Sequence, residues 1–358
     1  MREISERPKK GRGAISNDSS RYVAHACVAE DDGWVSERDG EAEAPTRTRI
    51  LVDSSRSIIS RNESPDVPFE LSINPYRGCE HGCAYCFARP THAYLGLSPG
   101  LDFETQIFCK PDAPMLLRKE LSRPGHCCSP IAVGINTDAY QPAERKLEIT
   151  RGILEVLQEY RHPFSIVTKS ALVERDMDIL APMAAQQLVQ VAVSITTLKA
   201  DVARTLEPRA TAPQRRVETV RRLADAGIPV SVMIAPVIPV LTDSELEAIL
   251  ACAREAGASG AGYVLIRLPH EVKDLFREWL EAHVPLRAAH VMKRIFDTRG
   301  GKAYEAGFGT RMRGTGPYAE LIAQRFHAAA RRLGFGPMPE LVTHLFHPPG
   351  VATQLSLL

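Results

Sequence analysis

Hydrophobic and polar positions along the chain alternate between two periods, one typical of strands and one typical of helices. Six segments are rich in Val, Ile and other residues that favour strands, and they are residues 69–74, 131–136, 164–169, 190–196, 230–238 and 262–268. Between them, apolar residues recur at the spacing of one helical face, in residues 144–160, 174–186, 212–227 and 242–257. Strands joined by helices at this spacing run parallel, because a tight turn cannot connect parallel neighbours.

This alternation predicts an α/β fold with a parallel sheet. The strands are nearly continuous apolar runs, which fits a sheet covered on both faces. Six such units can close partly into a barrel or lie open as a doubly wound sheet, and periodicity does not choose between the two. Two more helical patterns, residues 271–283 and 317–334, flank a glycine-rich stretch, residues 299–316. We interpret that stretch as an ordinary loop, because it follows no clear strand and lacks the spacing of a phosphate-binding loop.

The two ends of the chain differ from this central region. Residues 1–48 hold few apolar positions and no persistent period, so we predict a mobile N-terminal leader. We expect the barrel domain to cover residues 49–285 and a helical C-terminal extension to cover residues 286–358. From Arg287 onward the chain has 10 Lys and Arg against 4 Asp and Glu. This basic segment is either a solvated helical face or a patch that attracts nucleic acid or another anionic substrate.

Composition and the first residues bear on the compartment. The N-terminus is charged and polar where a secretory signal has an apolar run of about 7 to 15 residues. No stretch approaches the roughly 18 consecutive apolar residues of a membrane span. Eight cysteines among 358 residues, three of them within eight positions, are more typical of metal binding in a reducing compartment than of a disulfide framework. We therefore expect a cytoplasmic protein without a membrane partner.

A cysteine motif follows the first predicted strand directly, with the spacing CxxxCxxC, formed by Cys79, Cys83 and Cys86. Gly78 and Gly82 flank this loop and allow it to turn tightly. Three thiolates leave one iron of a four-iron cluster without a protein ligand, whereas an electron-transfer ferredoxin normally supplies four cysteines. The aromatic residues Tyr85 and Phe87 on either side of the last cysteine would restrict water. The motif therefore predicts a 4Fe-4S cluster that binds a small molecule at its open iron.

The main alternative is a structural zinc site in which His81 or His92 is the fourth ligand. The chain would then be a zinc-binding protein, or in a related alternative an iron-sulfur redox protein, without radical chemistry. We favour the cluster because zinc sites usually come as paired CxxC units. The other cysteines match no cluster spacing, and we expect idle or buried thiols at Cys27, Cys109, Cys127, Cys128 and Cys252.

The segment CEHGCAYC resembles the signature CxxxCΦxC of the radical S-adenosylmethionine superfamily, with Tyr85 at the aromatic position Φ. The resemblance implies a partial (β/α)6 TIM-like barrel over about residues 69–285, a 4Fe-4S cluster and S-adenosylmethionine as cofactors. It also implies a lyase-like or modification enzyme that receives one electron from a cellular reductant of the flavodoxin or ferredoxin type. The cluster then cleaves S-adenosylmethionine reductively, and the 5'-deoxyadenosyl radical abstracts hydrogen from a substrate.

Three segments, INPYRGCEHGCAYCFAR, TDAYQPAE and LEPRA, resemble the spore photoproduct lyase branch of that superfamily, whose members are often described as DNA repair photolyase related. This resemblance makes nucleic acid a possible substrate. It implies that Lys169 pairs with the methionine carboxylate and that Ser194 reaches the ribose or amino end of the cofactor. It places Thr137 near the amino group, with Asp138 as a second acceptor, and Tyr85 against the cofactor. Without the resemblance, the alternative interpretation is that Lys169 is a solvated residue at the end of a strand and that Ser194 makes a local hydrogen bond.

The candidates for substrate chemistry are less specific. Where the branch has a cysteine hydrogen donor, this chain has Ile135, which leaves thymine-dimer repair without its usual donor. Tyr140 is a candidate to relay a hydrogen atom, although a tyrosine at a buried strand end is often a packing residue. Arg209 is the second catalytic candidate, and with Glu207 it either lines the mouth of the barrel or forms an ion pair on a loop.

Two arginines of the glycine-rich stretch are candidates for a different task. Arg311 and Arg313 lie in the segment GTRMRGTG. A planar guanidinium suits the geometry of phosphate, so we expect this pair to bind a phosphate group of the substrate.

Overall fold

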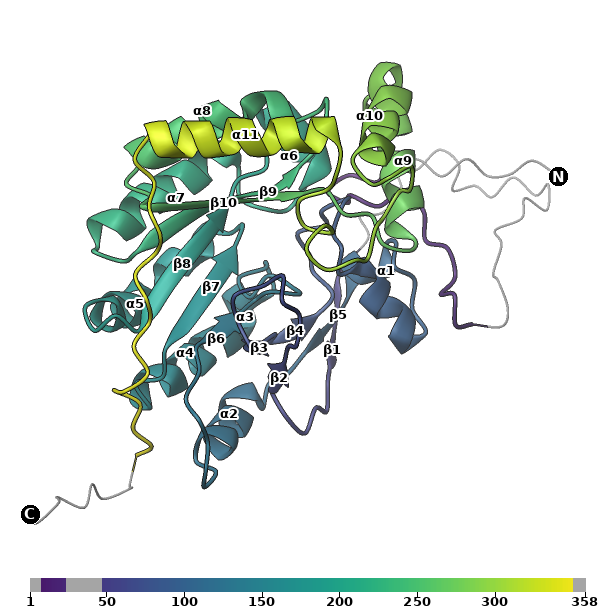
Figure 1. Cartoon of the computed structure of the whole chain (residues 1–358). Helices are drawn as coiled ribbons and strands as arrows, with labels where there is room; N and C mark the ends of the chain where they lie inside the picture. Colours follow the sequence, from purple (N-terminus) through teal and green to yellow (C-terminus); the bar gives the residue numbers. More distant parts are fainter. Residues whose placement is uncertain (1–7, 24–46, 350–358) are drawn as a thin grey trace, which may run out of the picture.

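The computed structural model describes residues 8–23 and 47–349, and a seven-stranded sheet runs through its centre (Figure 1). The strands lie in the order β10-β9-β8-β7-β6-β3-β2, and all neighbours are parallel except β2 and β3. Their bounds are β2 Ile59–Arg61, β3 Leu71–Ile73, β6 Ile131–Val133, β7 Phe164–Thr168, β8 Val189–Ser194, β9 Val230–Val237 and β10 Gly260–Leu265. All six predicted strands are confirmed, and β2 is an added antiparallel edge.

Helices cover the outer face of this sheet (Figure 1). Their bounds are α3 Glu144–Leu147, α4 Ile149–Glu159, α5 Met177–Ala184, α6 Ala200–Leu206, α7 Pro213–Asp225 and α8 Leu246–Glu255, with short 3-10 helices η3 Ala171–Asp176 and η4 Asp243–Glu245. Along β7, Phe164 and Ile166 are fully buried while Ser165 and Val167 are half-buried. One face of the sheet therefore packs on helices and the other lines an interior, as in a barrel.

The barrel is open on one side. In the described part of the chain, β2 and β10 stand at opposite ends of the sheet and do not pair with each other. The prediction of a partial (β/α)6 barrel is therefore confirmed, and the doubly wound alternative is not what forms. The outer edge of β10 is covered by backbone from two later segments, because Leu265 donates to the Met312 carbonyl at 2.9 Å and Gly336 donates to the Ser259 carbonyl at 3.1 Å.

One predicted helix, residues 144–160, forms as two. It breaks at Glu148, whose φ of 51° is outside the helical range. The Glu144 carboxylate accepts hydrogen bonds from the Thr150 amide at 3.0 Å and from the Tyr76 hydroxyl. This side chain satisfies an amide at the start of α4, so the chain restarts the helix at Ile149 instead of continuing α3.

A second, smaller sheet combines one strand that precedes β2 with two strands that lie between β3 and β6 in the sequence. It has the order β1-β5-β4, with bounds β1 Arg49–Val52, β4 Tyr76–Arg77 and β5 Gln106–Cys109. The same region holds the helices η2 Arg89–Leu95, α1 Asp102–Thr105 and α2 Ala113–Leu121. The sequence does not predict these strands, because segments of two to four residues are too short to show a period.

The C-terminal part adds three helices to the barrel, α9 Val272–His283, α10 Pro285–Asp297 and α11 Pro317–Arg332. Leu280 of α9 and Val291 of α10 share one hydrophobic cluster, and α11 packs on α8 and β10. The glycine-rich stretch is a loop, as expected, and Arg299 anchors it by donating to the carbonyls of Leu265 and Ile266. Among the described residues, no helix combines the length and the apolar character needed to cross a membrane.

Part of the expected leader is packed. Residues 1–7 and 24–46, which include Cys27, lie outside the described residues. Residues 8–23 lie within the predicted leader, yet Ala14 and Ile15 are buried and the carboxylate of Glu104 accepts hydrogen bonds from the backbone of Gly13 and Ala14. The polar composition of this segment does not predict its packing, because backbone amides, and not only apolar side chains, make the contact with the rest of the protein.

Two leucines on adjacent helices test how the core is built. Leu154 of α4 is fully buried, whereas Leu147 of α3 is exposed. Leu154→Ala is expected to cost about 2–5 kcal/mol of unfolding free energy, because a buried leucine leaves a cavity. Leu147→Ala is expected to cost less than about 1 kcal/mol. Urea unfolding followed by circular dichroism measures both, and equal losses would contradict this packing.

Candidate cofactor site

The three motif cysteines lie on one loop, residues 79–86, which we call the cysteine loop. Backbone hydrogen bonds coil it, since Gly82 donates to the Cys79 carbonyl at 3.3 Å and Cys86 donates to the Cys83 carbonyl at 3.2 Å. Cys79 and Cys83 are buried and Cys86 is half-buried. The loop contains no strand or helix, so contacts with the rest of the fold must determine its conformation.

The thiols lie close enough to influence one another. Burial raises the pKa of Cys79 well above its usual value, and the Asp138 carboxylate and the other two cysteines raise it further. Burial and Glu207 raise the pKa of Cys83 to about 12, while the Lys169 ammonium opposes the shift. Three thiols whose ionised forms repel one another fit a site in which the positive charge of bound iron would stabilise the thiolates.

The described residues contain no group of three His, Cys, Asp or Glu side chains close enough to enclose one metal ion. The two histidines considered as zinc ligands have other partners. The His81 Nδ1 lies 3.4 Å from the Asp138 carboxylate. His92 is buried, with its Nε2 3.0 Å from the Gln106 carbonyl. The cysteines outside the motif form no disulfide in the described residues, and the structure records Cys109, Cys127, Cys128 and Cys252 as free thiols.

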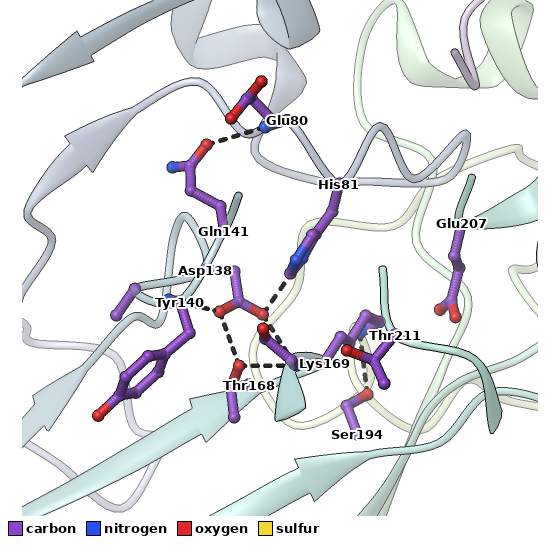
Figure 2. Close-up of polar contacts among 12 residues, drawn as sticks. Glu80, His81, Asp138, Tyr140, Gln141, Thr168, Lys169, Ser194, Glu207 and Thr211 are labelled. Atoms are coloured by element: carbon purple, nitrogen blue, oxygen red, sulfur yellow. Dashed lines mark hydrogen bonds and ion pairs between the residues drawn. The ribbon is translucent and has the colours of Figure 1, made fainter. Parts of the chain in front are cut away.

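Gln141 holds the first half of the cysteine loop. Its Oε1 accepts from the Glu80 amide at 2.8 Å and its Nε2 donates to the Gly78 carbonyl at 3.2 Å (Figure 2). Gln141 follows β6 in the TDAYQPAE segment and is fully buried. The sequence alone predicts no role for this glutamine. A side-chain amide has both a donor and an acceptor, so a buried glutamine can hold a backbone segment that is not paired in a sheet.

Asp138 connects the cysteine loop to the end of β7. Its carboxylate accepts from the Thr168 hydroxyl and the Lys169 amide, both at 2.7 Å, and lies beside His81 (Figure 2). Burial by itself would raise the pKa of Asp138, but His81 and these hydrogen bonds outweigh it and lower the pKa to about 2. Asp138 is therefore an ionised structural hub as well as a candidate cofactor acceptor.

Lys169 and Ser194 meet where neighbouring strands end. The Lys169 Nζ donates to the Ser194 Oγ at 2.9 Å and to the Ala235 carbonyl at 3.3 Å, at the ends of β7, β8 and β9. Its Nζ also lies 5.9 Å from the centre of the Tyr85 ring. Carboxyl ends of parallel strands share one edge of the barrel, where ligands collect in such folds. Tyr85, Lys169 and Ser194 are thus brought together, as their predicted role requires.

Glu207 forms a buried ion pair below Tyr85. Its carboxylate accepts from the Arg216 guanidinium at 2.5 Å, from the Thr196 hydroxyl at 2.8 Å and from the Tyr85 hydroxyl. Burial would raise the pKa of Glu207, but Arg216 and Lys169 lower it to about 2. Glu207 therefore pairs with Arg216. Arg209, the alternative partner considered from the sequence, instead lies 3.0 Å from Glu80 of the cysteine loop.

Other predicted residues lie in surroundings that favour structural roles. The Tyr140 hydroxyl donates to the buried Asp176 at 3.0 Å and points away from Lys169 (Figure 2), which favours the packing interpretation. Thr137 donates its hydroxyl to the Tyr76 carbonyl at 2.8 Å.

The two arginines of the glycine-rich stretch do not form a matched pair. Arg311 forms an ion pair with Asp66, which neutralises the guanidinium expected to bind phosphate. Arg313 donates its amide to the Thr310 carbonyl at 3.1 Å, and its guanidinium opposes the rise that burial causes in the pKa of Tyr263.

Together, the fold and the site define an open parallel α/β barrel with a three-cysteine loop beside the carboxyl ends of its strands. The chain belongs to the radical SAM superfamily, a superfamily of enzymes, because the model of that family matches residues 73–253, just over half of the chain. The predicted superfamily is thereby confirmed, and S-adenosylmethionine and an iron-sulfur cluster are the cofactors that membership implies.

Relatives from bacteria and archaea match part of the chain. An uncharacterized protein of Mycobacterium tuberculosis (strain H37Rv) is 40% identical over 223 residues, which cover 62% of this chain and 66% of the relative. The chain thus spans slightly less than two thirds of that relative's length. An uncharacterized protein of Methanocaldococcus jannaschii is 30% identical over 200 residues, which cover 56% of this chain and 72% of the relative.

Solved structures of spore photoproduct lyase share the fold. One mutant of that enzyme has a TM-score of 0.57 at 16% identity, covering 80% of both chains. Its complex with the dinucleoside spore photoproduct has a TM-score of 0.57 at 15% identity, also covering 80% of both chains. At this identity, the likeness shows a common fold.

The Glu207–Arg216 pair gives a pH-dependent prediction. Glu207→Gln leaves a buried guanidinium without its charged partner and is expected to cost about 3–5 kcal/mol at pH 7. The folded-state pKa of about 2 lies below the usual 4.5. Ionised Glu207 therefore stabilises the fold fully above pH 4.5, and this contribution is lost as the pH falls from about 4.5 to 2.

Urea midpoints at pH 7 and pH 3 measure this effect. The gap between wild type and Glu207→Gln should narrow at pH 3. Glu159→Gln is the control, because its ion pair with Arg118 is exposed and should be worth less than about 1 kcal/mol. A gap that stays constant with pH would contradict the buried, ionised pair.

Proposed function

We propose that Cys79, Cys83 and Cys86 ligate a 4Fe-4S cluster and that S-adenosylmethionine binds its fourth iron, next to Lys169. When bound, the reduced cluster supplies one electron that breaks a carbon-sulfur bond of S-adenosylmethionine, and the resulting 5'-deoxyadenosyl radical takes hydrogen from a substrate. One observation carries this proposal. Lys169 lies where the cysteine loop meets the strand ends, with its Nζ 5.9 Å from the centre of the ring of Tyr85, the residue before Cys86, and 2.9 Å from the Ser194 Oγ.

The Lys169 ammonium has one more hydrogen-bond donor available for an anion. An ammonium has three donors, and the described residues use two of them, on the Ser194 hydroxyl and the Ala235 carbonyl. These two acceptors fix the direction of the third donor. A carboxylate held near the cysteine loop would accept that bond, which is the role we propose for Lys169 toward the methionine carboxylate. Ser194 then acts as the residue that orients the lysine.

The Tyr85 ring limits access to this position. Its hydroxyl is held by Glu207 and by Thr196, and the side chain is buried. A fixed aromatic ring on the cysteine loop, 5.9 Å from the Lys169 Nζ, excludes water and offers a flat apolar face to the cofactor. Low water content strengthens each charged contact in the site. Thr137 and Asp138 lie in the loop after β6. We propose that, in addition to their structural hydrogen bonds, they complete the cofactor contacts near the amino group.

We further propose a nucleic-acid substrate. Two exposed aromatic rings carry a guanidinium on one face, Phe87 with Arg267 at 4.9 Å and Phe308 with Arg311 at 4.7 Å. Because Arg311 is paired with Asp66, we assign the phosphate contact to Arg267. Phe87 directly follows the last cluster cysteine. Exposed rings beside arginines are suited to stack bases and attract phosphates. Spore photoproduct lyase, which shares this fold, has been solved with a dinucleoside photoproduct, which supports the same class of substrate.

Enzymes of this superfamily need an electron source, and a one-electron protein reductant of the flavodoxin or ferredoxin type is our proposed partner. A chemical reductant can replace it in the test. Anaerobically reconstituted protein with dithionite and S-adenosylmethionine is expected to form methionine and 5'-deoxyadenosine, measured by mass spectrometry. Cys83→Ala is expected to abolish both cluster absorbance and product. Cys252→Ala should retain both, because this thiol lies in α8, away from the loop. A full cluster without cofactor cleavage would overturn the proposal.

Lys169 gives a separate prediction for binding. In the cluster-loaded protein, Lys169→Ala is expected to weaken S-adenosylmethionine binding by about 10- to 100-fold, since one charge-assisted hydrogen bond is lost. Lys199→Ala is the matched control, because this lysine is exposed at the start of α6 and should leave the dissociation constant unchanged. Equilibrium dialysis with labelled cofactor measures both variants. Equal affinities for Lys169→Ala and wild type would remove the lysine from the cofactor site.

A further inference from the structure

Residues 11–16, which we call the strap, lie directly on the cysteine loop. The closest approach is at Gly13, where an added Cβ would lie 1.8 Å from the Gly82 carbonyl oxygen and 3.1 Å from the Ala84 amide nitrogen. These two residues flank Cys83 in the sequence. Any side chain at position 13 would therefore push the strap off the loop, so that only glycine allows the contact.

The Glu104 carboxylate links the strap to the loop. One oxygen accepts from the Gly13 amide at 3.0 Å, and the other accepts from the Ala14 amide at 2.8 Å and from the Arg89 guanidinium at 2.5 Å. Arg89 in turn donates its Nε to the Cys83 carbonyl at 2.9 Å. Both charged side chains are fully buried. A buried ion pair is stable only when its remaining hydrogen-bonding groups are satisfied, and the strap supplies two of the donors.

The strap also spans the open side of the barrel. Ala14 forms a small apolar cluster with two leucines. Leu101 lies between β3 and β6 in the sequence, and Leu275 lies in α9, the helix after the last strand. Just beyond the strap, Arg21 forms an ion pair with Glu271 at 2.6 Å. In Figure 1 the purple N-terminal trace runs beside α1 and α9. The segment thus connects the region after β3 with the region after β10, which the sheet leaves unconnected.

We propose that the strap and Glu104 hold the cysteine loop in its cluster-binding conformation and shield the cluster from solvent and oxygen. This inference rests on the proposed function, in which the loop carries an iron-sulfur cluster. Glu104 is a positioning residue, because it acts on the cluster through Arg89 and the Cys83 backbone. The loop has no regular structure of its own. Loss of the strap would leave the buried carboxylate with two fewer donors and the loop with one face open to water.

Glu104→Gln tests the carboxylate. The amide keeps the shape but loses the charge, and its NH2 group turns donors toward either the Gly13 amide or the Ala14 amide and Arg89. Glu120→Gln is the matched control, since Glu120 accepts from the backbone amides of Ile58 and Ile59 in the same way on α2. In air, the visible absorbance of reconstituted Glu104→Gln is expected to bleach at least about tenfold faster than wild type, the equivalent of one charge-assisted hydrogen bond. Glu120→Gln should bleach at the wild-type rate.

Gly13→Ala tests the strap in protein without cluster. Hydrogen exchange at residues 79–86 is expected to accelerate in this variant, and by more than exchange in the strands of the barrel. Gly336→Ala is the control, because an added Cβ there meets no atom within 4 Å. A wild type that holds no four-iron cluster would refute the proposed function, yet the exchange experiment would still test the strap. Unchanged bleaching and exchange, or equal effects in the controls, would overturn the inference.

Discussion

Buried carboxylates around the cysteine loop are the interactions on which the site depends. Glu104, Asp138 and Glu207 approach the loop from three different parts of the chain, and each carries hydrogen bonds from backbone or buried cations. An isolated buried charge would destabilise the fold, so each must keep its partners. The loop that is expected to carry the cluster is therefore positioned by charge pairs that are costly to rearrange.

The same constraint connects fold and chemistry. Parallel strands bring Lys169, directly after β7, and Ser194 of β8 to a common edge, and the Asp138 carboxylate accepts a hydrogen bond from the Lys169 amide. The cysteine loop then lies over this edge, with the Tyr85 ring 5.9 Å from the Lys169 Nζ. Geometry of this kind depends on the barrel scaffold, because neither the loop nor the strand ends hold their positions alone.

The sequence predicts much of the scaffold and less of the site. Strands such as residues 190–196 have a strong apolar pattern, and the cysteine spacing is specific, so both appear where expected. Glu104, Gln141 and Arg89 are missed because a polar residue shows no period that reveals burial. The choice of partner is missed for the same reason, since Glu207 selects Arg216, nine residues away, over Arg209. Pairing of this type is a property of three-dimensional packing.

The covered edge of β10 has a further consequence for the molecule in a crowded solution. An open barrel has two outer strands whose free backbone groups invite association with another chain. Here β2 is only three residues long, and the Met312 and Gly336 backbones already occupy groups along β10. The barrel can therefore remain open for chemistry without offering a long template for intermolecular sheet growth.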